Sequence, residues 1–81
     1  LIQEVLMVRN WLISAREEAG LSQSQIADMI GVSQPTYWEY ERGKSTPRVD
    51  KAKKIASLLG LSWTRFYDDR EENAHENDAR P

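Results

Sequence analysis

The 81-residue sequence contains no cysteine, which excludes a disulfide framework and a thiolate metal site. A chain without cysteine suits a reducing compartment, so we expect a cytoplasmic protein. No apolar run approaches the about 20 residues that a membrane-spanning helix needs, and no signal peptide is visible, so we expect no membrane association. The chain begins with Leu rather than Met, which is consistent with a fragment or with the loss of a few residues.

Side chains that carry enzyme chemistry are also scarce. The only histidine, His75, lies in a polar C-terminal segment. The sequence has no Gly-rich phosphate loop, nucleophile elbow or metal-spaced cluster. The adjacent carboxylates Glu17-Glu18 and Asp68-Asp69 are more typical of solvated surfaces than of catalytic pairs. A chain of this length buries one modest core and is too short for a large substrate cleft. We therefore expect neither an enzyme nor a bound cofactor or metal.

The net charge of −2 is unfavourable for binding nucleic acid, but the charge is unevenly distributed. Residues 68–81 hold six acidic and two basic residues, or −4, which leaves +2 for residues 1–67. Six basic residues against one acid lie between positions 42 and 54: Arg42, Lys44, Arg48, Lys51, Lys53 and Lys54. Affinity for DNA follows a local basic surface more than the total charge. For the three lysines after Asp50, the alternative is an ordinary solvated helix face.

Two helix starts lie close together in the middle of the chain. Ser22 precedes Gln25 by three residues, the spacing of a capping box in which each side chain bonds the other residue's backbone N–H. Ser33 repeats the pattern before a second amphipathic segment. These signals predict two short helices, over residues 23–30 and 34–42.

The connection between these helices is only Gly31, Val32 and Ser33. Gly31 stands where a helix end favours a left-handed residue, and glycine adopts positive φ without a Cβ clash. Ala27, four residues earlier, is small enough to let the helices approach. Helices joined by so tight a turn cross at a steep angle, which predicts a helix-turn-helix.

The remaining apolar residues predict three more helices. The first stripe, which ends before Gly20, consists of Leu1, Val5, Val8, Leu12, Ala15 and Ala19. The stripe that follows Pro47 and ends before Gly60 consists of Val49, Ala52, Ile55, Ala56 and Leu59. A last short helix, capped by Ser62, has an aromatic face formed by Trp63, Phe66 and Tyr67. We expect one domain over residues 1–67 and a disordered acidic tail over residues 68–81.

Many residues in this order match one known family. They are Arg16, Gly20-Leu21-Ser22-Gln23, Ile26-Ala27, Gly31-Val32-Ser33, Tyr40-Glu41-Arg42-Gly43-Lys44, Pro47, Ile55-Ala56 and Leu59-Gly60. On these residues the chain, from about Val8 to Tyr67, resembles the lambda-repressor-like (Xre/Cro/CI) family of DNA-binding regulators. The resemblance implies an all-α, five-helix domain. It also implies a sequence-specific transcriptional regulator of phage, mobile-element or bacterial type, most simply a repressor, that binds a two-fold double-stranded DNA operator as a homodimer.

A second interpretation uses the same scaffold differently. The first seven residues are more apolar than a solvated helix end requires, and the last predicted helix carries Trp63 and Tyr67. Such surfaces could extend the core, pack across a dimer or hold a protein partner. The alternative function is therefore a protein-interaction module, as in antitoxins that bind a toxin.

For base recognition, the resemblance assigns the first, second and sixth residues of the second motif helix: Gln34, Pro35 and Glu39. The Gln34 amide can pair bidentately with adenine, and Glu39 can accept from cytosine. Pro35 has no donor and offers only apolar contact, for instance to a thymine methyl group. An ion pair with Arg42 is the alternative for Glu39.

Trp38 is the fourth candidate for base contact. By helical period Tyr37, Tyr40 and Glu41 point inward, which leaves Trp38 outside. We expect its indole to lie along a sugar-phosphate wall or on a thymine methyl group, the alternative being burial against the following loop.

Contacts to DNA phosphates are expected at helix starts and basic loops. The candidates are Gln23, Ser33, Thr36, Arg42 and Lys44. In the family the residue at Gln23 binds phosphate and braces the first reading residue, here Gln34. The alternative for Thr36 is a hydroxyl that only assists the cap. The resemblance also implies a partly buried structural ion pair between Arg16 and Glu41, which we do not assign to DNA.

Overall fold

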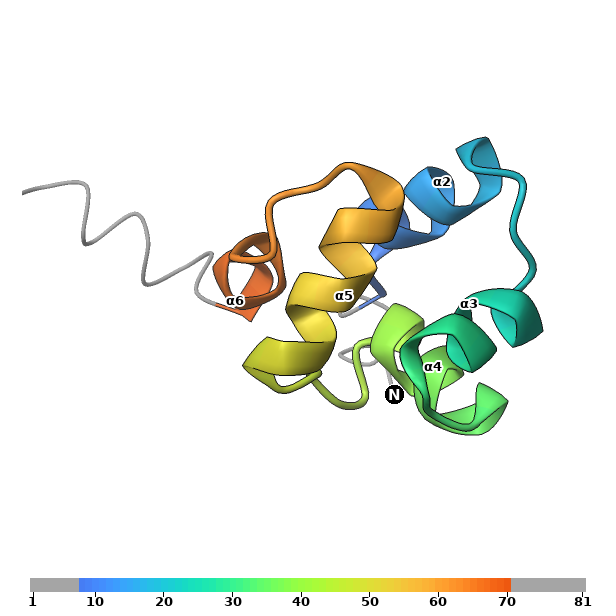
Figure 1. The fold of residues 1–81 in the computed structure, drawn as a ribbon. Coiled ribbons are helices and arrows are strands. Elements are labelled where there is room, and N and C mark those ends of the chain that lie inside the picture. Colours follow the sequence, from blue (N-terminus) through green and yellow to red (C-terminus); the bar gives the residue numbers. More distant parts are fainter. Residues whose placement is uncertain (1–7, 71–81) are drawn as a thin grey trace, which may run out of the picture.

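The computed structural model describes residues 8–70, which form five helices (Figure 1). The helices are α2 (Asn10–Glu18), α3 (Gln23–Ile30), α4 (Gln34–Arg42), α5 (Val49–Leu59) and α6 (Arg65–Arg70). No strand occurs within this range, so the predicted all-α, five-helix architecture is confirmed. Among these five helices, none has the length and apolar character to cross a membrane.

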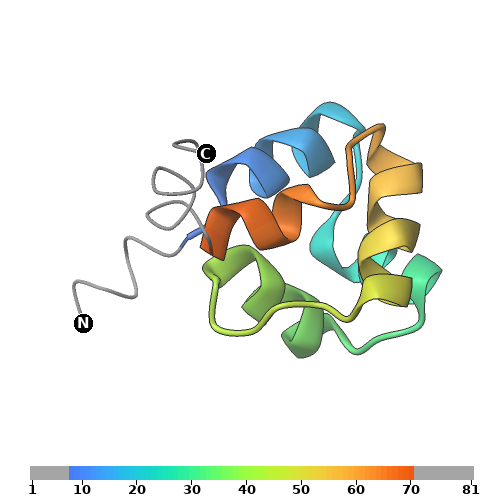
Figure 2. The same cartoon turned by 90° about the vertical axis from the view of Figure 1, so that its left-hand side faces the viewer.

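One hydrophobic core holds the helices together, and every helix contributes to it. Its buried members are Leu12, Ile26, Ala27, Ile30, Tyr37, Tyr40, Ala52, Ile55 and Phe66. Figure 2 shows α2 and α6 side by side, where the rings of Trp11 and Phe66 meet edge to face with centroids 5.1 Å apart. α3, α4 and α5 close the other side of the core, and this arrangement leaves one side of α4 on the surface (Figure 1).

Both helices of the predicted motif have the expected bounds, and their predicted caps are present. The backbone N–H of Gln25 donates to Ser22 Oγ (3.0 Å), and Gln25 Oε1 accepts from the backbone N–H of Ser22 (2.8 Å). The backbone N–H of Thr36 donates to Ser33 Oγ (3.2 Å). Gly31 has φ of +80°, as the tight turn requires. The predicted helix-turn-helix is therefore confirmed.

The prediction of one long first helix is wrong in its N-terminal part. α2 begins at Asn10, and the two preceding residues, Val8 and Arg9, are not helical. The backbone N–H of Arg9 donates instead to the carbonyl of Glu41 (2.8 Å), so this segment is held against the end of α4. The apolar residues 1–7 lie outside the described residues.

The end of the domain also differs from the prediction. α6 begins at Arg65, three residues after Ser62. The residues between them form a turn, in which the hydroxyls of Ser62 and Thr64 share a hydrogen bond (2.8 Å) and the backbone N–H of Arg65 donates to the carbonyl of Ser62 (3.1 Å). α6 continues to Arg70, so the first three residues of the predicted tail are helical. Residues 71–81 lie outside the described residues. Val49, assigned to the buried stripe, is 45 % exposed because it stands at the first position of α5.

We predict that Gly31→Ala lowers the free energy of unfolding by about 1–2 kcal/mol, the cost of placing a Cβ in the left-handed region. The added methyl group would meet only Lys51 Nζ, at 3.6 Å, so the effect is one of backbone strain. Urea unfolding followed by circular dichroism measures it. Ser57→Ala, at an exposed position of α5, is the control and should not lose stability. Equal stability of the two variants would contradict the prediction.

Candidate nucleic-acid interface

The sorting of α4 into a buried and an exposed face is confirmed. Tyr37, Tyr40 and Glu41 are buried. Burial raises the pKa of the Tyr37 hydroxyl, and the negative charge of Glu41 raises it further, so this phenol stays neutral. The exposed side chains of α4 are those that the sequence assigned to the outside: Gln34, Pro35, Trp38, Glu39 and Arg42.

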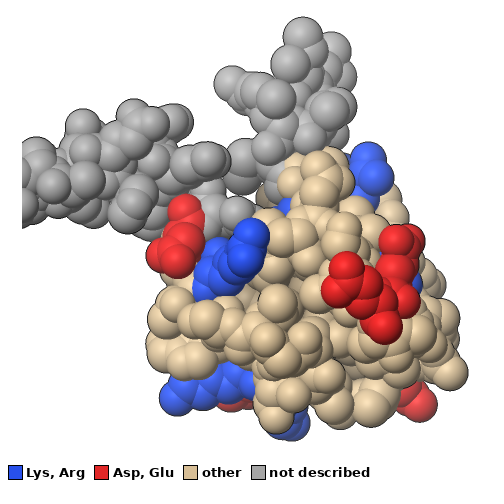
Figure 3. All heavy atoms as spheres, turned by 90° about the horizontal axis from the view of Figure 1, so that it is seen from above, with Lys and Arg blue, Asp and Glu red and all other residues tan. Residues whose placement is uncertain are grey.

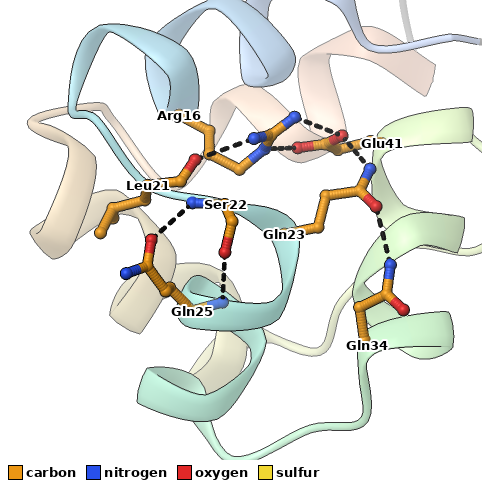
Figure 4. Close-up of polar contacts among 7 residues, drawn as sticks. All are labelled: Arg16, Leu21, Ser22, Gln23, Gln25, Gln34 and Glu41. Atoms are coloured by element: carbon orange, nitrogen blue, oxygen red, sulfur yellow. Dashed lines mark hydrogen bonds and ion pairs between the residues drawn. The ribbon is translucent and has the colours of Figure 1, made fainter.

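A buried ion pair fixes the inner face of α4 to α2 (Figure 4). Arg16 Nε donates to Glu41 Oε2 at 2.6 Å, and the two side chains are only 11 % and 1 % exposed. Arg16 Nη1 also donates to the carbonyl of Leu21 (2.8 Å) at the entry to α3. The hydrogen bond to Glu41 raises the pKa of Arg16. The ion pair that the resemblance implies is present, and its arginine joins three segments of the chain.

Two glutamine amides extend this ion pair to the surface of α4 (Figure 4). Gln23 Nε2 donates to Glu41 Oε1 at 2.8 Å, and Gln34 Nε2 donates to Gln23 Oε1 at 2.8 Å. A carboxylate only accepts hydrogen bonds, so Glu41 requires the NH₂ group of Gln23 to face it. The oxygen of Gln23 then faces Gln34 and requires the NH₂ group of Gln34. Glu41 thus sets the direction of both amides.

After making this bond, the Gln34 amide still has one donor and one acceptor to offer to a ligand. Its Nε2 donates one hydrogen to Gln23. The second N–H and the carbonyl oxygen can still bond a ligand, because the side chain is exposed. One donor and one acceptor side by side match the N7 and N6 positions of adenine. Pro35 follows at the first turn of the helix, where its missing N–H removes a donor that would need a partner.

The hydroxyls at the start of α4 bond each other as well as the backbone. Ser33 Oγ donates to Thr36 Oγ1 (2.9 Å) while it accepts from the Thr36 backbone N–H. The Thr36 hydroxyl therefore assists the cap, as its alternative assignment expected. Its own proton is still able to donate outward, so a phosphate contact is compatible with this geometry.

Three exposed side chains gather at the C-terminal end of α4. The guanidinium carbon of Arg42 lies 5.4 Å from the centroid of the Trp38 ring, and Lys44 Nζ lies 5.7 Å from it. Trp38 is 37 % exposed, so the following loop does not bury it completely. The alternative ion pair between Glu39 and Arg42 is not formed within the described structure, because Arg42 lies over the indole instead.

Sequence reasoning missed Arg9, which is only 2 % exposed. Its Nη1 donates to the carbonyls of Tyr40 (2.6 Å) and Ser45 (3.0 Å), and its Nη2 donates to Thr46 Oγ1 (2.9 Å). Arg9 thus donates to two carbonyls at the end of α4, that of Glu41 through its backbone N–H and that of Tyr40 through its guanidinium. A helix end leaves such carbonyls without intrahelical partners. The positive charge of Arg9 also suits the negative end of the helix dipole. The signal in the sequence that could have identified Arg9 is a charged residue within a mostly apolar segment.

A second cation closes the end of α3. Lys51 Nζ donates to the carbonyl of Ile30 at 3.0 Å, at the helix end that precedes the turn. Lys53 Nζ lies 5.1 Å from the centroid of the Trp63 ring. Of the three lysines first considered as a basic face, these two therefore have partners within the domain, which favours a structural role for them.

On one other face of the domain, the described residues form no continuous basic area. Figure 3 looks onto the face formed by α2 and the connection between α5 and α6. On the described part of this face, isolated charged groups stand among uncharged residues, and acidic side chains gather at one side. Basic groups combined with exposed amides and hydroxyls lie instead on and after α4.

These features agree with comparisons to known proteins. A helix-turn-helix family model matches residues 12–66. The chain belongs to this family. An uncharacterised helix-turn-helix transcriptional regulator of Bacillus subtilis, YqaF, is 36 % identical over 63 residues, which are 78 % of this chain and 83 % of that protein.

A phage protein is also similar. The transcriptional repressor RstR of the cryptic phage CTXphi, from Vibrio cholerae, is 34 % identical over 61 residues, or 75 % of this chain. The match covers 55 % of RstR, so the chain spans only about half the length of this second relative.

We predict that Arg9→Met lowers the free energy of unfolding by about 1–3 kcal/mol, because the hydrogen bonds from the guanidinium to the carbonyls of Tyr40 and Ser45 and to the hydroxyl of Thr46 are lost. Arg65→Met is the matched control. Arg65 is exposed, and its guanidinium carbon lies 5.0 Å from the Trp11 centroid, much as that of Arg9 lies 5.6 Å from the Phe66 centroid. Within the described structure, the Arg65 side chain makes no hydrogen bond to a carbonyl. Its loss should cost less than about 0.5 kcal/mol. Thermal unfolding compares the variants, and equal losses would show that the carbonyl contacts contribute nothing.

Proposed function

We propose that the chain represses transcription by placing α4 in the major groove of an operator and reading bases with Gln34, Pro35 and Glu39. Its family and its relatives are those of DNA-binding transcriptional regulators of the Xre type. The single observation that carries the proposal is the Gln34 amide, exposed at the start of α4 and oriented through Gln23 by a buried carboxylate. A donor and acceptor held in one orientation is what base readout requires.

Phosphate contacts would hold α4 in register on the duplex. The proposed contacts are Gln23 and Ser33 with Thr36 at the helix starts, and Arg42 with Lys44 at the exit of α4. Helix starts offer N–H groups, and the two cations offer charge, so the DNA backbone would be held at both ends of the reading helix.

The proposal includes a homodimer. One helix of nine residues touches only a few base pairs, and two-fold operators allow two copies to double that length. Trp63 and Tyr67 are candidates for the contact between copies, since both are partly exposed on the last turns of the domain. Selection of binding sites from random double-stranded DNA tests this: half-sites repeated at about 10 base pairs or a multiple support a dimer, and single isolated half-sites contradict it.

The alternative, a protein-interaction module, receives less support. Phe66 is fully buried in the core, and the Tyr67 hydroxyl donates to the carbonyl of Pro47 at 2.9 Å. Within α6, the Phe66 ring and the Tyr67 hydroxyl thus have partners inside the domain, whereas part of the Tyr67 side chain stays exposed. The apolar residues 1–7 lie outside the described part of the chain.

We predict that Gln34→Ala weakens binding by about 1–3 kcal/mol at one base-pair position of the selected site and relaxes the preference there. Binding to duplexes with all four bases at each position measures this. Gln25→Ala removes the same side chain from the start of α3, where it only closes the capping box, and should leave base preference unchanged. A uniform loss across all sequences would make Gln34 a positioning residue.

We predict that Arg42→Ala and Lys44→Ala each weaken binding to every duplex. Each should reduce the slope of log K against log salt by about 0.9, because one phosphate contact is lost. Arg65→Ala removes an equal charge beside Trp11 and should leave the slope unchanged. If the slope is also unchanged for Arg42→Ala or Lys44→Ala, that residue does not bind phosphate.

A further inference from the structure

We infer that Trp38, Arg42 and Lys44 form one phosphate-binding unit, in which the indole is a positioning residue that holds both cations for a backbone phosphate of DNA. The inference rests on the proposed function and replaces the role of base contact for Trp38. Below, the three residues together are called the indole clamp.

The contacts around the ring lead to this assignment. The charged groups of Arg42 and Lys44 lie 5.4 and 5.7 Å from the ring centroid of Trp38, within the distance at which a cation is attracted to an indole face. Arg42 stands four residues after Trp38, one helical turn along the same face. Lys44 follows Gly43, whose φ of +76° ends α4 and turns the chain. Helix period and glycine turn thus bring both cations to one ring.

The indole ring stabilises two cations that would otherwise repel each other at this site. Two like charges near one ring repel each other, and flexible Arg and Lys side chains lose rotamer freedom when a ligand fixes them. A ring that attracts both cations limits the places where they can lie before DNA arrives. Binding a phosphate oxygen between or beside them then costs less side-chain entropy than binding to two free side chains.

The same contacts disfavour Trp38 as a reader of bases. The two cations occupy space over the ring, where a thymine methyl group or a stacked base would otherwise lie. Phosphate contacts carry no sequence information, so the clamp should affect all duplexes equally.

The test is a double-mutant cycle measured by fluorescence anisotropy with two labelled duplexes, one carrying a selected site and one of mixed sequence. We expect Trp38→Leu to weaken binding to both by about 5- to 20-fold and Trp38→Phe, which keeps a weaker ring, to have a smaller effect. In an Arg42→Gln/Lys44→Gln background, Trp38→Leu should change affinity less than twofold, because the cations that it positions are gone. Thermal unfolding shows whether each variant is folded. If Trp38→Leu does not fold, the DNA affinity of Trp38→Phe is compared in the two backgrounds instead.

Three outcomes would overturn the inference. Trp38→Leu could leave binding unchanged, it could weaken only duplexes with one particular base pair, or its full effect could persist without Arg42 and Lys44. In each case the wild-type protein still binds DNA, so the proposed function stands while the indole clamp fails. If the wild-type protein binds neither duplex, the proposed function fails and the clamp fails with it.

Discussion

The buried ion pair between Arg16 and Glu41 is the contact on which the exposed chemistry of this domain depends. Arg16 Nε and Glu41 Oε2 lie 2.6 Å apart, and the two side chains are 11 % and 1 % exposed, so water has little access to this ion pair. Removal of one partner of such a pair costs about 3–5 kcal/mol, since the remaining charge is stranded. The Glu41 carboxylate also has a second role. Its other oxygen accepts a hydrogen bond from Gln23, and this bond determines the orientation of the Gln34 amide at the surface. Stability and the proposed base recognition therefore depend on one carboxylate.

The sequence predicted the motif well because its signals are local. Ser22 with Gln25, Ser33 before α4 and Gly31 between the helices act over three or four residues, and the two helices have the predicted bounds. Helical period also separated the buried side of α4 from the exposed side. The resemblance to a known family supplied the pairing of Arg16 with Glu41, 25 positions apart, which no local pattern could give.

The errors occurred where distant contacts override local patterns. The apolar period through Val8 favoured a continuous helix, but the backbone and side chain of Arg9 bond to residues more than 30 positions later in the chain. Likewise, the sequence placed Lys51 in a basic surface, with a solvated helix face as the alternative, whereas its amine donates to the carbonyl of Ile30. Sequence spacing does not encode such pairings. The arrangement of cations around Trp38 depends on side-chain positions after a glycine turn, and it too required coordinates.

The positions of these cations explain why a motif of about 20 residues needs a domain of about 60 around it. A helix of eight or nine residues is too short to be stable alone in water. Each motif helix ends in carbonyls that lack intrahelical partners. Backbone N–H groups of the turns that follow supply some of the donors, and residues outside the motif supply others: Lys51 for α3 and Arg9 for α4. Arg16 adds the lateral hold on α4 from α2. The helices flanking the motif thus supply its missing hydrogen bonds as well as its core. As a result, α4 leaves the Gln34 amide and the Arg42 cation on the surface, while the Ser33 hydroxyl caps the start of the helix.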